Sequence, residues 1–336
     1  MKKAVIAGLA ALALAGAAPA QAQDKITQLN FGIISTESSS GLQQSFGPLL
    51  AALEKAVGVP VKAYFAQDYA GVIEGMRFKK VDLAWYGNAS AIEAVDRANG
   101  EVFVQTTKPD GTRGYYSLLI TSSENSEINS LEDAIDCSKG LNFGIGDPNS
   151  TSGFLVPTYY VFALNNVDPQ TCYRRVVTSN HEGNALAVAN KQVDLATNNT
   201  ESMDRLDKSR PGERKKIKEV WRSPLIPSDP LVWRKDLPED VKARLYTIFL
   251  TYGRMGTPED VKTARAVLGQ ASDGWGPFIA SSDAQLYPIR QLDLYKTKLQ
   301  LENNANISAD DKKAQIAEID AQLAELETLM EEVPNM

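Results

Sequence analysis

The sequence predicts an α/β protein of two lobes, each a mostly parallel sheet flanked by helices. Short apolar segments alternate with helical patterns, as expected when helices cover both faces of a parallel sheet. Two patterns also occur twice at one offset of 112 residues: LNFGI begins at 29 and again at 141, and VDLA begins at 81 and again at 193. Each half is therefore predicted to run strand, helix, strand, helix, strand.

The composition agrees with this prediction. The chain has 336 residues, which suits two domains, and its 43% hydrophobic and 23% charged residues are typical of a globular protein. A net charge of −7 and the lack of a long lysine and arginine run argue against nucleic acid as a partner. The single histidine, His181, excludes a metal site built from several histidines, and no cofactor is expected.

Residues 1–22 have the order of a secretory signal peptide. Two lysines precede an apolar run over 4–17, and Pro19 and the sequence AQA over 20–22 follow as the cleavage region. An apolar run of about 14 residues is too short to span a membrane as a helix. We expect cleavage after Ala22 and, as a hypothesis, export to a Gram-negative periplasm.

The first lobe is expected to comprise residues 23–119 and 222–300. Its first strand begins at Leu29, and a helix is predicted over 41–57, where apolar residues recur at helical spacing and Gly58 follows as a C-cap. The second lobe is expected over 120–221. In it, strands are predicted at 141–146, 173–178 and 193–196, and helices at 154–165 and 184–190.

Two extended segments are expected to connect the lobes. Residues 115–120 lead out of the first lobe, and residues 221–233 lead back with three prolines, which disfavour helix. Two lobes joined by two crossings form a hinged clamp with a ligand cleft between them. Helices then follow at 238–252, 257–269, 283–300 and 309–332.

The C-terminal tail, 301–336, is predicted to be helical. Its apolar side chains follow the 3-4-3-4 spacing of a coiled-coil seam. Two interpretations fit this seam: packing against the chain's own lobe, or homodimerisation through the C-terminal helix. The seam residues are Ile316, Ile319, Leu323, Leu326 and Met330.

Cys137 and Cys172 each stand just before a predicted strand. If the two strands are parallel neighbours, both sulfur atoms lie at one edge of the sheet, and a disulfide is feasible. Closing a loop of about 35 residues would stabilise the fold by roughly 3–4 kcal/mol in an exported protein. The alternative is a pair of free thiols.

The turn 147–153, DPNSTSG, connects a predicted strand to a predicted helix. Free backbone N–H groups, the helix dipole and adjacent hydroxyls together make an anion site at such a turn. The alternative is ordinary N-capping, for which one of Ser150, Thr151 and Ser152 would suffice. The turn is not a Walker loop, because it has no lysine.

Several segments resemble the periplasmic phosphonate-binding proteins of bacterial ABC importers, and the resemblance extends over about 29–300. It implies the type II, two-lobed substrate-binding fold. The segments that carry it are FGIISTE (31–37), DYAG (68–71), AWYGN (84–88), GDPNSTSG (146–153), TNNTE (197–201) and SPLIP (223–227).

The resemblance also implies a ligand site, and each of its eight positions matches the family pattern. Donors would surround the phosphonate oxygens, and two carboxylates would face the ammonium group of 2-aminoethylphosphonate. The donors are Ser150, Thr151, Ser152, Tyr69, Tyr115 and His181, and the carboxylates are Glu201 and Asp229.

Each residue type suits its role and also has a plainer explanation. Hydroxyls and an imidazole can replace the water that an oxyanion loses, whereas Tyr69 or Tyr115 taken alone fits a core aromatic better than a ligand contact. A dianion would favour protonated His181, although a histidine can also be merely structural. A ligand without an amine would leave the two carboxylates buried and unpaired, and the free-energy cost of this would disfavour its binding. Asp229 before a proline is also a common turn residue.

The resemblance implies a binding protein that delivers phosphonates to an ABC permease and its ATPase, rather than an enzyme. Alternatives are a receptor for methylphosphonate or phosphite, and a sensor coupled to a chemoreceptor. A weaker alternative is a hydrolase of phosphorus esters that uses a cleft serine with His181 as base, but the sequence lacks a nucleophile elbow.

Overall fold

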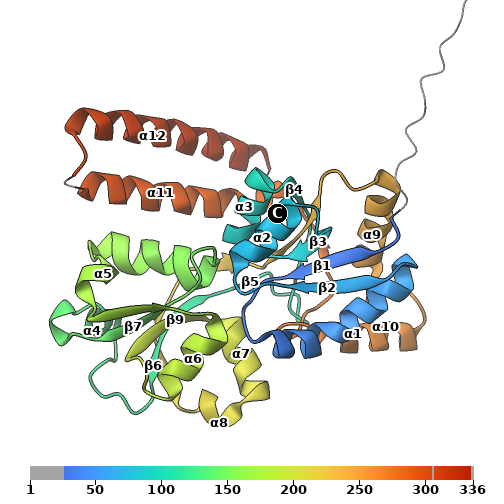
Figure 1. Ribbon diagram of the computed structural model, residues 1–336, viewed down its shortest axis with the longest axis horizontal. Helices are drawn as coiled ribbons and strands as arrows, with labels where there is room; N and C mark the ends of the chain where they lie inside the picture. The colour runs from blue at the N-terminus through green and yellow to red at the C-terminus, as the bar shows by residue number, and fades with distance from the viewer. Residues whose placement is uncertain (1–25, 305, 334–336) are drawn as a thin grey trace, which may run out of the picture.

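The computed structural model describes residues 26–304 and 306–333, so the proposed signal peptide over 1–22 lies outside the described residues. Two helix-flanked sheets form two lobes, which confirms the predicted two-lobed α/β fold. A hairpin of α11 (Tyr287–Asn303) and α12 (Ala309–Glu332) lies beside them (Figure 1). Among the described helices, none combines the length and apolar character needed to cross a membrane.

The sheet of the first lobe has six strands, and three neighbouring strands at one edge run parallel to one another. Its strands are β1 (Leu29–Ile33), β2 (Val61–Phe65), β3 (Leu83–Trp85), β4 (Gly100–Gln105), β12 (Pro230–Arg234) and β13 (Ile279–Ala280). They are ordered β13-β4-β12-β3-β1-β2, and β12 is antiparallel to both its neighbours.

The sheet of the second lobe repeats this pattern. Its strands are β6 (Ser117–Ser122), β7 (Asn142–Ile145), β8 (Arg175–Thr178), β9 (Leu195–Asn199) and β10 (Ile217–Arg222). They are ordered β10-β6-β9-β7-β8, with β7, β8 and β9 parallel and β6 antiparallel to both its neighbours. Between the sheets, β5 (Gly114–Tyr115) pairs with β11 (Ile226–Pro227), so the two crossings run side by side.

The repeated sequence patterns make the same contact in both lobes. The Asn30 N–H donates to Asp82 Oδ2 at 2.8 Å, and the Asp82 N–H donates back to the Asn30 carbonyl at 2.9 Å. At the same 112-residue offset, the Asn142 N–H donates to Asp194 Oδ2 at 2.6 Å, and the Asp194 N–H returns a bond of 2.9 Å. The repeated aspartate therefore connects the start of β3 to β1 in the first lobe and the start of β9 to β7 in the second.

Helices cover both faces of each sheet (Figure 1). In the first lobe they are α1 (Ser39–Val57), α2 (Tyr69–Arg77), α3 (Asn88–Arg97), α9 (Glu239–Thr251), α10 (Pro258–Leu268) and the short η5 (Asp283–Leu286). In the second they are α4 (Leu131–Ala134), η1 (Cys137–Lys139), α5 (Pro169–Cys172), α6 (His181–Ala189), α7 (Thr200–Ser209) and α8 (Pro211–Arg214). Helix α1 ends at Gly58, whose φ of 77° is the left-handed conformation expected of a glycine cap.

The helix predicted over 154–165 differs from the expectation. It begins at Thr151 and is wound in wide π turns, η2 (Thr151–Leu155) and η3 (Thr158–Phe162), followed by the tighter η4 (Ala163–Asn165). The Leu155 N–H reaches back five residues to the Ser150 carbonyl at 3.0 Å. Because the first turn is wide, the helix starts within the serine-rich turn itself.

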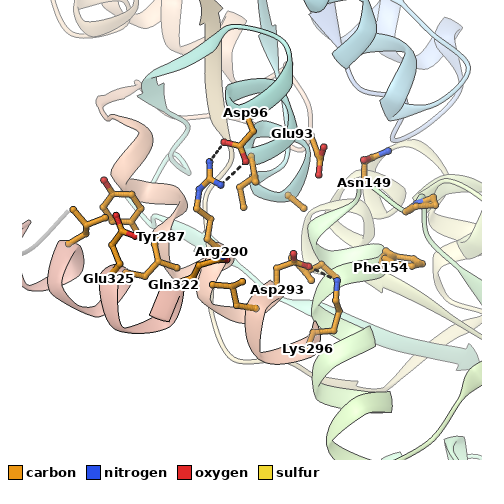
Figure 2. Close-up of a pocket in the computed structure, with 17 residues that line it drawn as sticks. Glu93, Asp96, Asn149, Phe154, Tyr287, Arg290, Asp293, Lys296, Gln322 and Glu325 are labelled. Carbon is orange, nitrogen blue, oxygen red and sulfur yellow. Dashed lines mark hydrogen bonds and ion pairs between the residues drawn. The ribbon is translucent and has the colours of Figure 1, made fainter. Parts of the chain in front are cut away.

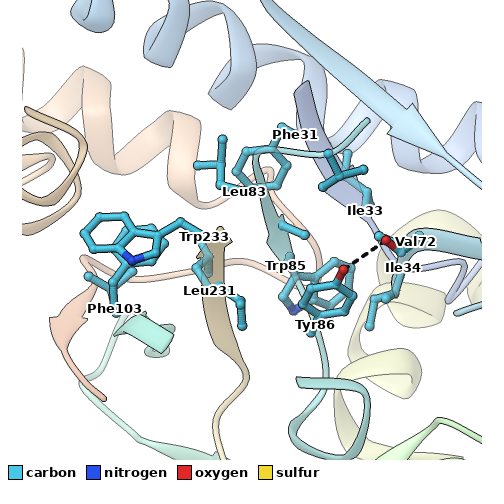
Figure 3. Close-up of a cluster of buried hydrophobic side chains, with 14 of the residues drawn as sticks. Phe31, Ile33, Ile34, Val72, Leu83, Trp85, Tyr86, Phe103, Leu231 and Trp233 are labelled. Atoms are coloured by element: carbon cyan, nitrogen blue, oxygen red, sulfur yellow. Dashed lines mark hydrogen bonds between the residues drawn. The ribbon is translucent and has the colours of Figure 1, made fainter. Parts of the chain in front are cut away.

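The core of the first lobe leads directly to the cleft. Trp85 is stacked on Phe46 with ring centroids 5.3 Å apart and meets Trp275 edge-on at 5.7 Å. Figure 3 shows the neighbouring Tyr86, whose hydroxyl donates to the Val72 carbonyl at 3.0 Å. The indole of Trp85 is therefore fixed by packing at the carboxyl end of β3, where the cleft begins.

The α12 seam is covered within the chain. Ile319, Leu323 and Leu326 are buried, and α12 packs along α11 (Figure 1). Lys298 of α11 forms an ion pair with Asp320 of α12 at 2.5 Å. The seam is thus used inside one chain, and homodimerisation stays a prediction.

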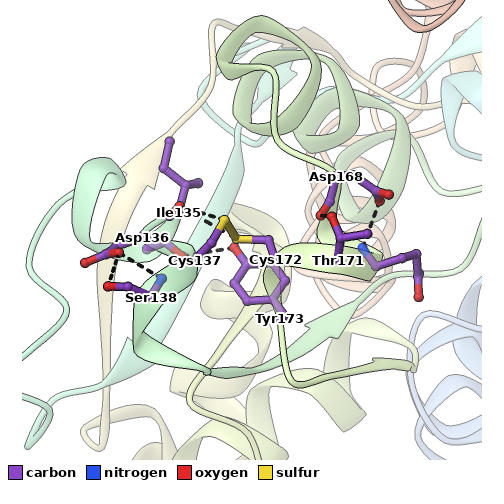
Figure 4. Close-up of a disulfide and its surroundings, with 10 residues drawn as sticks. Ile135, Asp136, Cys137, Ser138, Asp168, Thr171, Cys172 and Tyr173 are labelled. Carbon is purple, nitrogen blue, oxygen red and sulfur yellow. Dashed lines mark hydrogen bonds between the residues drawn. A yellow bond between two sulfur atoms is a disulfide. The ribbon is translucent and has the colours of Figure 1, made fainter. Parts of the chain in front are cut away.

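Cys137 and Cys172 are joined by a disulfide at one edge of the second sheet (Figure 4). Cys137 begins η1 just before β7, and Cys172 ends α5 just before β8. Strands β7 and β8 are parallel neighbours, so their amino ends bring the two sulfur atoms together.

We predict that denatured, unreduced protein has no titratable thiol. Reduction should lower the free energy of unfolding by about 3–4 kcal/mol, because the cross-link restricts the unfolded chain. Thiol titration and chemical unfolding with and without reductant measure both effects. The double variant Cys137→Ser/Cys172→Ser is the control and should not respond to reductant, and two reactive thiols in the unreduced wild type would contradict the cross-link.

Candidate ligand-binding site

Helix N-termini from both lobes face the cleft, and the repeat places them in pairs. Asp68 caps α2 by accepting the Gly71 N–H at 2.8 Å, and Asn180, 112 residues later, caps α6 by accepting the Gly183 N–H at 2.8 Å. Helix α6 therefore starts at its cap, earlier than the predicted 184–190, and puts His181 in its first turn. N–H groups and helix dipoles make this cleft suited to an anion.

The turn 147–153 divides its hydroxyls between capping and other contacts. Ser150 is the N-cap and accepts the Gly153 N–H at 3.0 Å. Thr151 Oγ1 accepts the Ala89 N–H at 2.8 Å, and Ser152 Oγ accepts the Asn199 Nδ2 amide at 2.8 Å. Capping thus uses only one of the three hydroxyls, and the other two act as acceptors whose own hydrogens are left to donate.

All eight residues predicted for the site line one small cavity between the lobes. Each is at most 6% exposed. The hydroxyl turn and α6 and α7 lie in the second lobe, α2 and the residue before β12 lie in the first, and one tyrosine lies in β5 of the crossing. These residues are Tyr69, Tyr115, Ser150, Thr151, Ser152, His181, Glu201 and Asp229.

His181 lies at the hydroxyl side of the cavity. Its Nε2 is 3.4 Å from Ser150 Oγ and 3.3 Å from Asn199 Nδ2, while its buried Nδ1 has no partner in the described residues. Burial and, as the smaller cause, the positive charge of Arg205 together lower the pKa of His181 to about 3. The imidazole is therefore neutral near pH 7 and can both donate and accept one hydrogen bond.

Glu201 and Asp229 line the same cavity and lie close enough for the charge of one to affect the other. The Trp85 indole N–H donates to Asp229 Oδ2 at 2.9 Å, and Asp229 Oδ1 has no partner within the described chain. Burial raises the pKa of Glu201, and burial together with the charge of Glu201 raises the pKa of Asp229 well above its usual range. Both carboxyl groups are therefore difficult to ionise in the absence of a ligand. A bound cation would favour their ionised forms.

Two tyrosines complete the lining of the cavity. Tyr69 lies near Ser150, and Tyr115 lies near Asp229. Burial raises the pKa of both hydroxyls, so both stay protonated and remain donors. Their place in the cavity argues against a purely structural role.

Contacts across the cleft hold the lobes in a closed arrangement. The Tyr69 N–H donates to Asp147 Oδ2 at 3.1 Å. Arg205 of α7 forms an ion pair with Glu37 at 3.7 Å and donates to Ser272 Oγ at 3.1 Å, and both partners lie in the first lobe. The cavity retains about 10 Å³ of free space. A ligand therefore needs the lobes to move apart before it can enter.

Some lining residues were missed by the sequence reasoning. Thr36, Trp85 and Asn199 lie within segments that carried the family resemblance, but only the structure turns them toward the cavity. Arg205 follows Glu201 by four residues on α7, a helical spacing that could have indicated it. In the described chain, no cluster of His, Cys, Asp and Glu is arranged to hold a metal ion.

A larger groove of about 710 Å³ lies between α3, the turn at 148–155 and the α11–α12 hairpin. Figure 2 shows Arg290 in this groove, donating to both oxygens of Asp96 at 2.7 and 2.6 Å. The groove contains none of the eight predicted site residues. The interlobe cavity is therefore the candidate site.

A closed α/β clamp with a polar cavity between its lobes defines a two-lobed substrate-binding protein. A family model described as "ABC transporter, phosphonate, periplasmic substrate-binding protein" matches residues 31–286. The chain belongs to this family of periplasmic substrate-binding components of phosphonate ABC transporters.

Two individual relatives agree with this family membership. The chain is 55% identical to the phosphonates-binding periplasmic protein of Escherichia coli (strain K12) over 311 residues, 93% of this chain and 89% of that protein. It is 32% identical to the phosphate-import protein PhnD of Mycolicibacterium smegmatis over 233 residues, 66% of this chain and 70% of that one. These relatives are transport components, which argues against the hydrolase alternative.

Solved structures show the same fold. The binding protein component of an ABC phosphonate transporter from Pseudomonas aeruginosa matches with a TM-score of 0.85 and 52% identity, over 91% of this chain and 98% of that one. A protein of Prochlorococcus marinus in complex with methylphosphonate matches with a TM-score of 0.67 and 22% identity, over 79% of this chain and 97% of that one.

We predict that Arg205→Met weakens binding of 2-aminoethylphosphonate and methylphosphonate alike, roughly 5–50-fold, because contacts made only by the closed lobes are lost. Titration calorimetry measures both affinities. Arg214→Met is the matched control, since Arg214 pairs with Asp207 at 3.5 Å inside the second lobe. Unchanged affinities in Arg205→Met would remove these contacts from the closed, liganded state.

Proposed function

We propose that this protein captures phosphonates, with 2-aminoethylphosphonate as the preferred ligand, in the interlobe cavity and delivers them to an ABC importer. The observation that carries the proposal is that hydroxyl and imidazole donors and two buried carboxyl groups line one cavity between the lobes. Family membership and the 55% identical phosphonates-binding relative support phosphonate as the anion.

The donor side matches the phosphonate group. Three oxygens and up to two negative charges lose their water in the closed cleft, and charge-assisted hydrogen bonds must replace it. The hydroxyls of Ser150, Thr151 and Ser152 offer hydrogens at the start of η2, where backbone N–H groups and the helix dipole add positive potential. Tyr69 closes over them from the first lobe.

The carboxylate side matches an ammonium group. Asp229 Oδ1 is buried and has no partner among residues 26–304 and 306–333, and Glu201 lies in the first turn of α7 at 6% exposure. A positive ligand group would satisfy both, whereas a ligand without an amine leaves two buried carboxyls unpaired. The pair therefore favours aminoalkylphosphonates over methylphosphonate, phosphite and phosphate.

The partners of the loaded protein would be the permease and ATPase at the inner membrane, in keeping with the family. We propose export by the signal peptide 1–22, with the mature chain beginning after Ala22. A homodimer would have to use another surface of α12 than the seam that faces α11.

We predict that Glu201→Gln weakens 2-aminoethylphosphonate binding by roughly 30-fold or more, because it removes a charge that pairs with the ammonium group in a desolvated site. Methylphosphonate binding should change little. Calorimetry with both ligands separates the two roles, and equal losses for both ligands would contradict an ammonium role for Glu201.

We predict that Thr151→Val weakens every phosphonate, roughly 5–50-fold, because the lost hydroxyl serves the anion common to them all. Thr151→Ser keeps the hydroxyl and is the matched control. A thermal-shift series with 2-aminoethylphosphonate, methylphosphonate, phosphite and phosphate ranks the ligands, since each stabilises the folded state according to its affinity. If all four ligands raise the Tm of Thr151→Val as much as that of the wild type, Thr151 does not belong to the site.

We predict that 2-aminoethylphosphonate binding releases protons. Burial raises the pKa values of Glu201 and Asp229 in the ligand-free protein, and a bound ammonium group lowers them again. Affinity should therefore rise with pH between the ordinary carboxyl range and the raised values. Calorimetry in buffers of different ionisation enthalpy measures the release.

Asp229→Asn is the control for this release and should reduce it. Methylphosphonate has no ammonium group, so its binding should not draw protons from the carboxyl pair. Proton release of equal size with both ligands would contradict this origin.

A further inference from the structure

Thr36 is a buried residue of the first lobe at the edge of the interlobe cavity, and its side chain is 5% exposed. Its Oγ1 has no hydrogen-bond partner among the described residues. Two other side-chain atoms at this cavity share that property, His181 Nδ1 and Asp229 Oδ1. A buried polar group without a partner costs free energy, so three such atoms around one cavity indicate groups that a ligand satisfies.

We propose that the Thr36 hydroxyl is a further ligand contact, which donates a hydrogen bond to a phosphonate oxygen from the first lobe when the lobes close. The inference rests on the proposed function, because it names an additional donor for the same anion. His181 and Asp229 were expected in the site from the family resemblance, whereas Thr36 was not.

The backbone of Thr36 meets the second lobe close to the residues proposed to bind the anion. The Thr36 carbonyl accepts the Glu182 N–H of α6 at 3.2 Å, across the cleft. Glu182 follows His181, whose ring lies 3.4 Å from Ser150. Thr36 therefore meets the part of the second lobe that carries the donors for the anion.

The chain holds Thr36 firmly in this place. Its N–H donates to the Ile34 carbonyl at 2.9 Å, directly after β1, and Ser38 caps α1 two residues later. The Ser38 N–H also donates to the Glu182 carboxylate at 2.9 Å. These cross-cleft bonds, at Thr36 and at Ser38, form when the lobes are closed. The Thr36 hydroxyl would therefore reach the ligand only in the closed arrangement, and the ligand would connect the two lobes at this point.

The variants Thr36→Val and Thr36→Ser test the proposal. Valine has nearly the shape of threonine without the hydroxyl, and serine keeps the hydroxyl. Titration calorimetry with 2-aminoethylphosphonate and methylphosphonate should show roughly 10–100-fold weaker binding of both ligands to Thr36→Val, the range for a hydrogen bond to a charged group. Thr36→Ser should stay within about threefold of the wild type, since its donor remains.

Thermal unfolding without ligand separates a ligand contact from a structural role. Removing a buried hydroxyl that has no partner should leave the Tm of ligand-free Thr36→Val unchanged or raise it. Weaker binding together with an undiminished Tm is the expected result. A lowered Tm in both variants with equal losses of affinity would overturn the proposal in favour of a packing role.

The remaining outcomes are also decisive. Thr36→Val with wild-type affinity for both ligands would overturn this inference and leave the proposed function intact. A loss confined to 2-aminoethylphosphonate would overturn the assignment of the hydroxyl to the anion. A wild-type protein that binds neither phosphonate would instead overturn the proposed function, and this inference with it.

Discussion

The proposed function depends on one physical requirement: inside a closed cleft, the protein has to replace the water that a doubly charged oxyanion loses. No single side chain can do this, so the donors come from helix starts and hydroxyls in both lobes and from the crossing between them. The repeat provides the geometry: in each lobe, parallel strands end at the cleft and helices begin there, and the paired caps Asp68 and Asn180 are held in the same way. An anion at such a position meets oriented N–H groups that need no rearrangement.

The same cavity is costly when it is closed and empty. His181 is buried in its neutral form, one oxygen of Asp229 has no partner in the part of the chain that the structure describes, and two carboxyl groups share a desolvated space. The proposed zwitterionic ligand would remove all three costs at once, because its anion would accept hydrogen bonds from the donors and its cation would pair with the carboxylates. Contacts such as Arg205 with Glu37 form only between closed lobes, so ligand binding and closure stabilise one another.

Much of this could be read from the sequence, for identifiable reasons. The duplication was visible because each Asn and Asp of the repeated patterns makes a contact that the fold needs twice, and the cysteines could be placed because β7 and β8 are parallel neighbours. The eight residues proposed for the site from the family resemblance all line the interlobe cavity, although Tyr115, His181 and Asp229 lie outside the segments that carry the resemblance. Thr36 was missed because a threonine after a strand has no sequence signature, and only its unsatisfied hydroxyl marks it. The early start of η2 and the partner of α12 depend on tertiary packing, which residue spacing does not encode.

A crystal structure of the protein with 2-aminoethylphosphonate tests the central claim most directly. The account predicts closed lobes, phosphonate oxygens within about 3 Å of the hydroxyls of Ser150, Thr151 and Ser152, and the ammonium nitrogen at a similar distance from Glu201 and Asp229. A ligand bound in the groove beside α11 and α12, or one whose amine faces the hydroxyl turn, would contradict it.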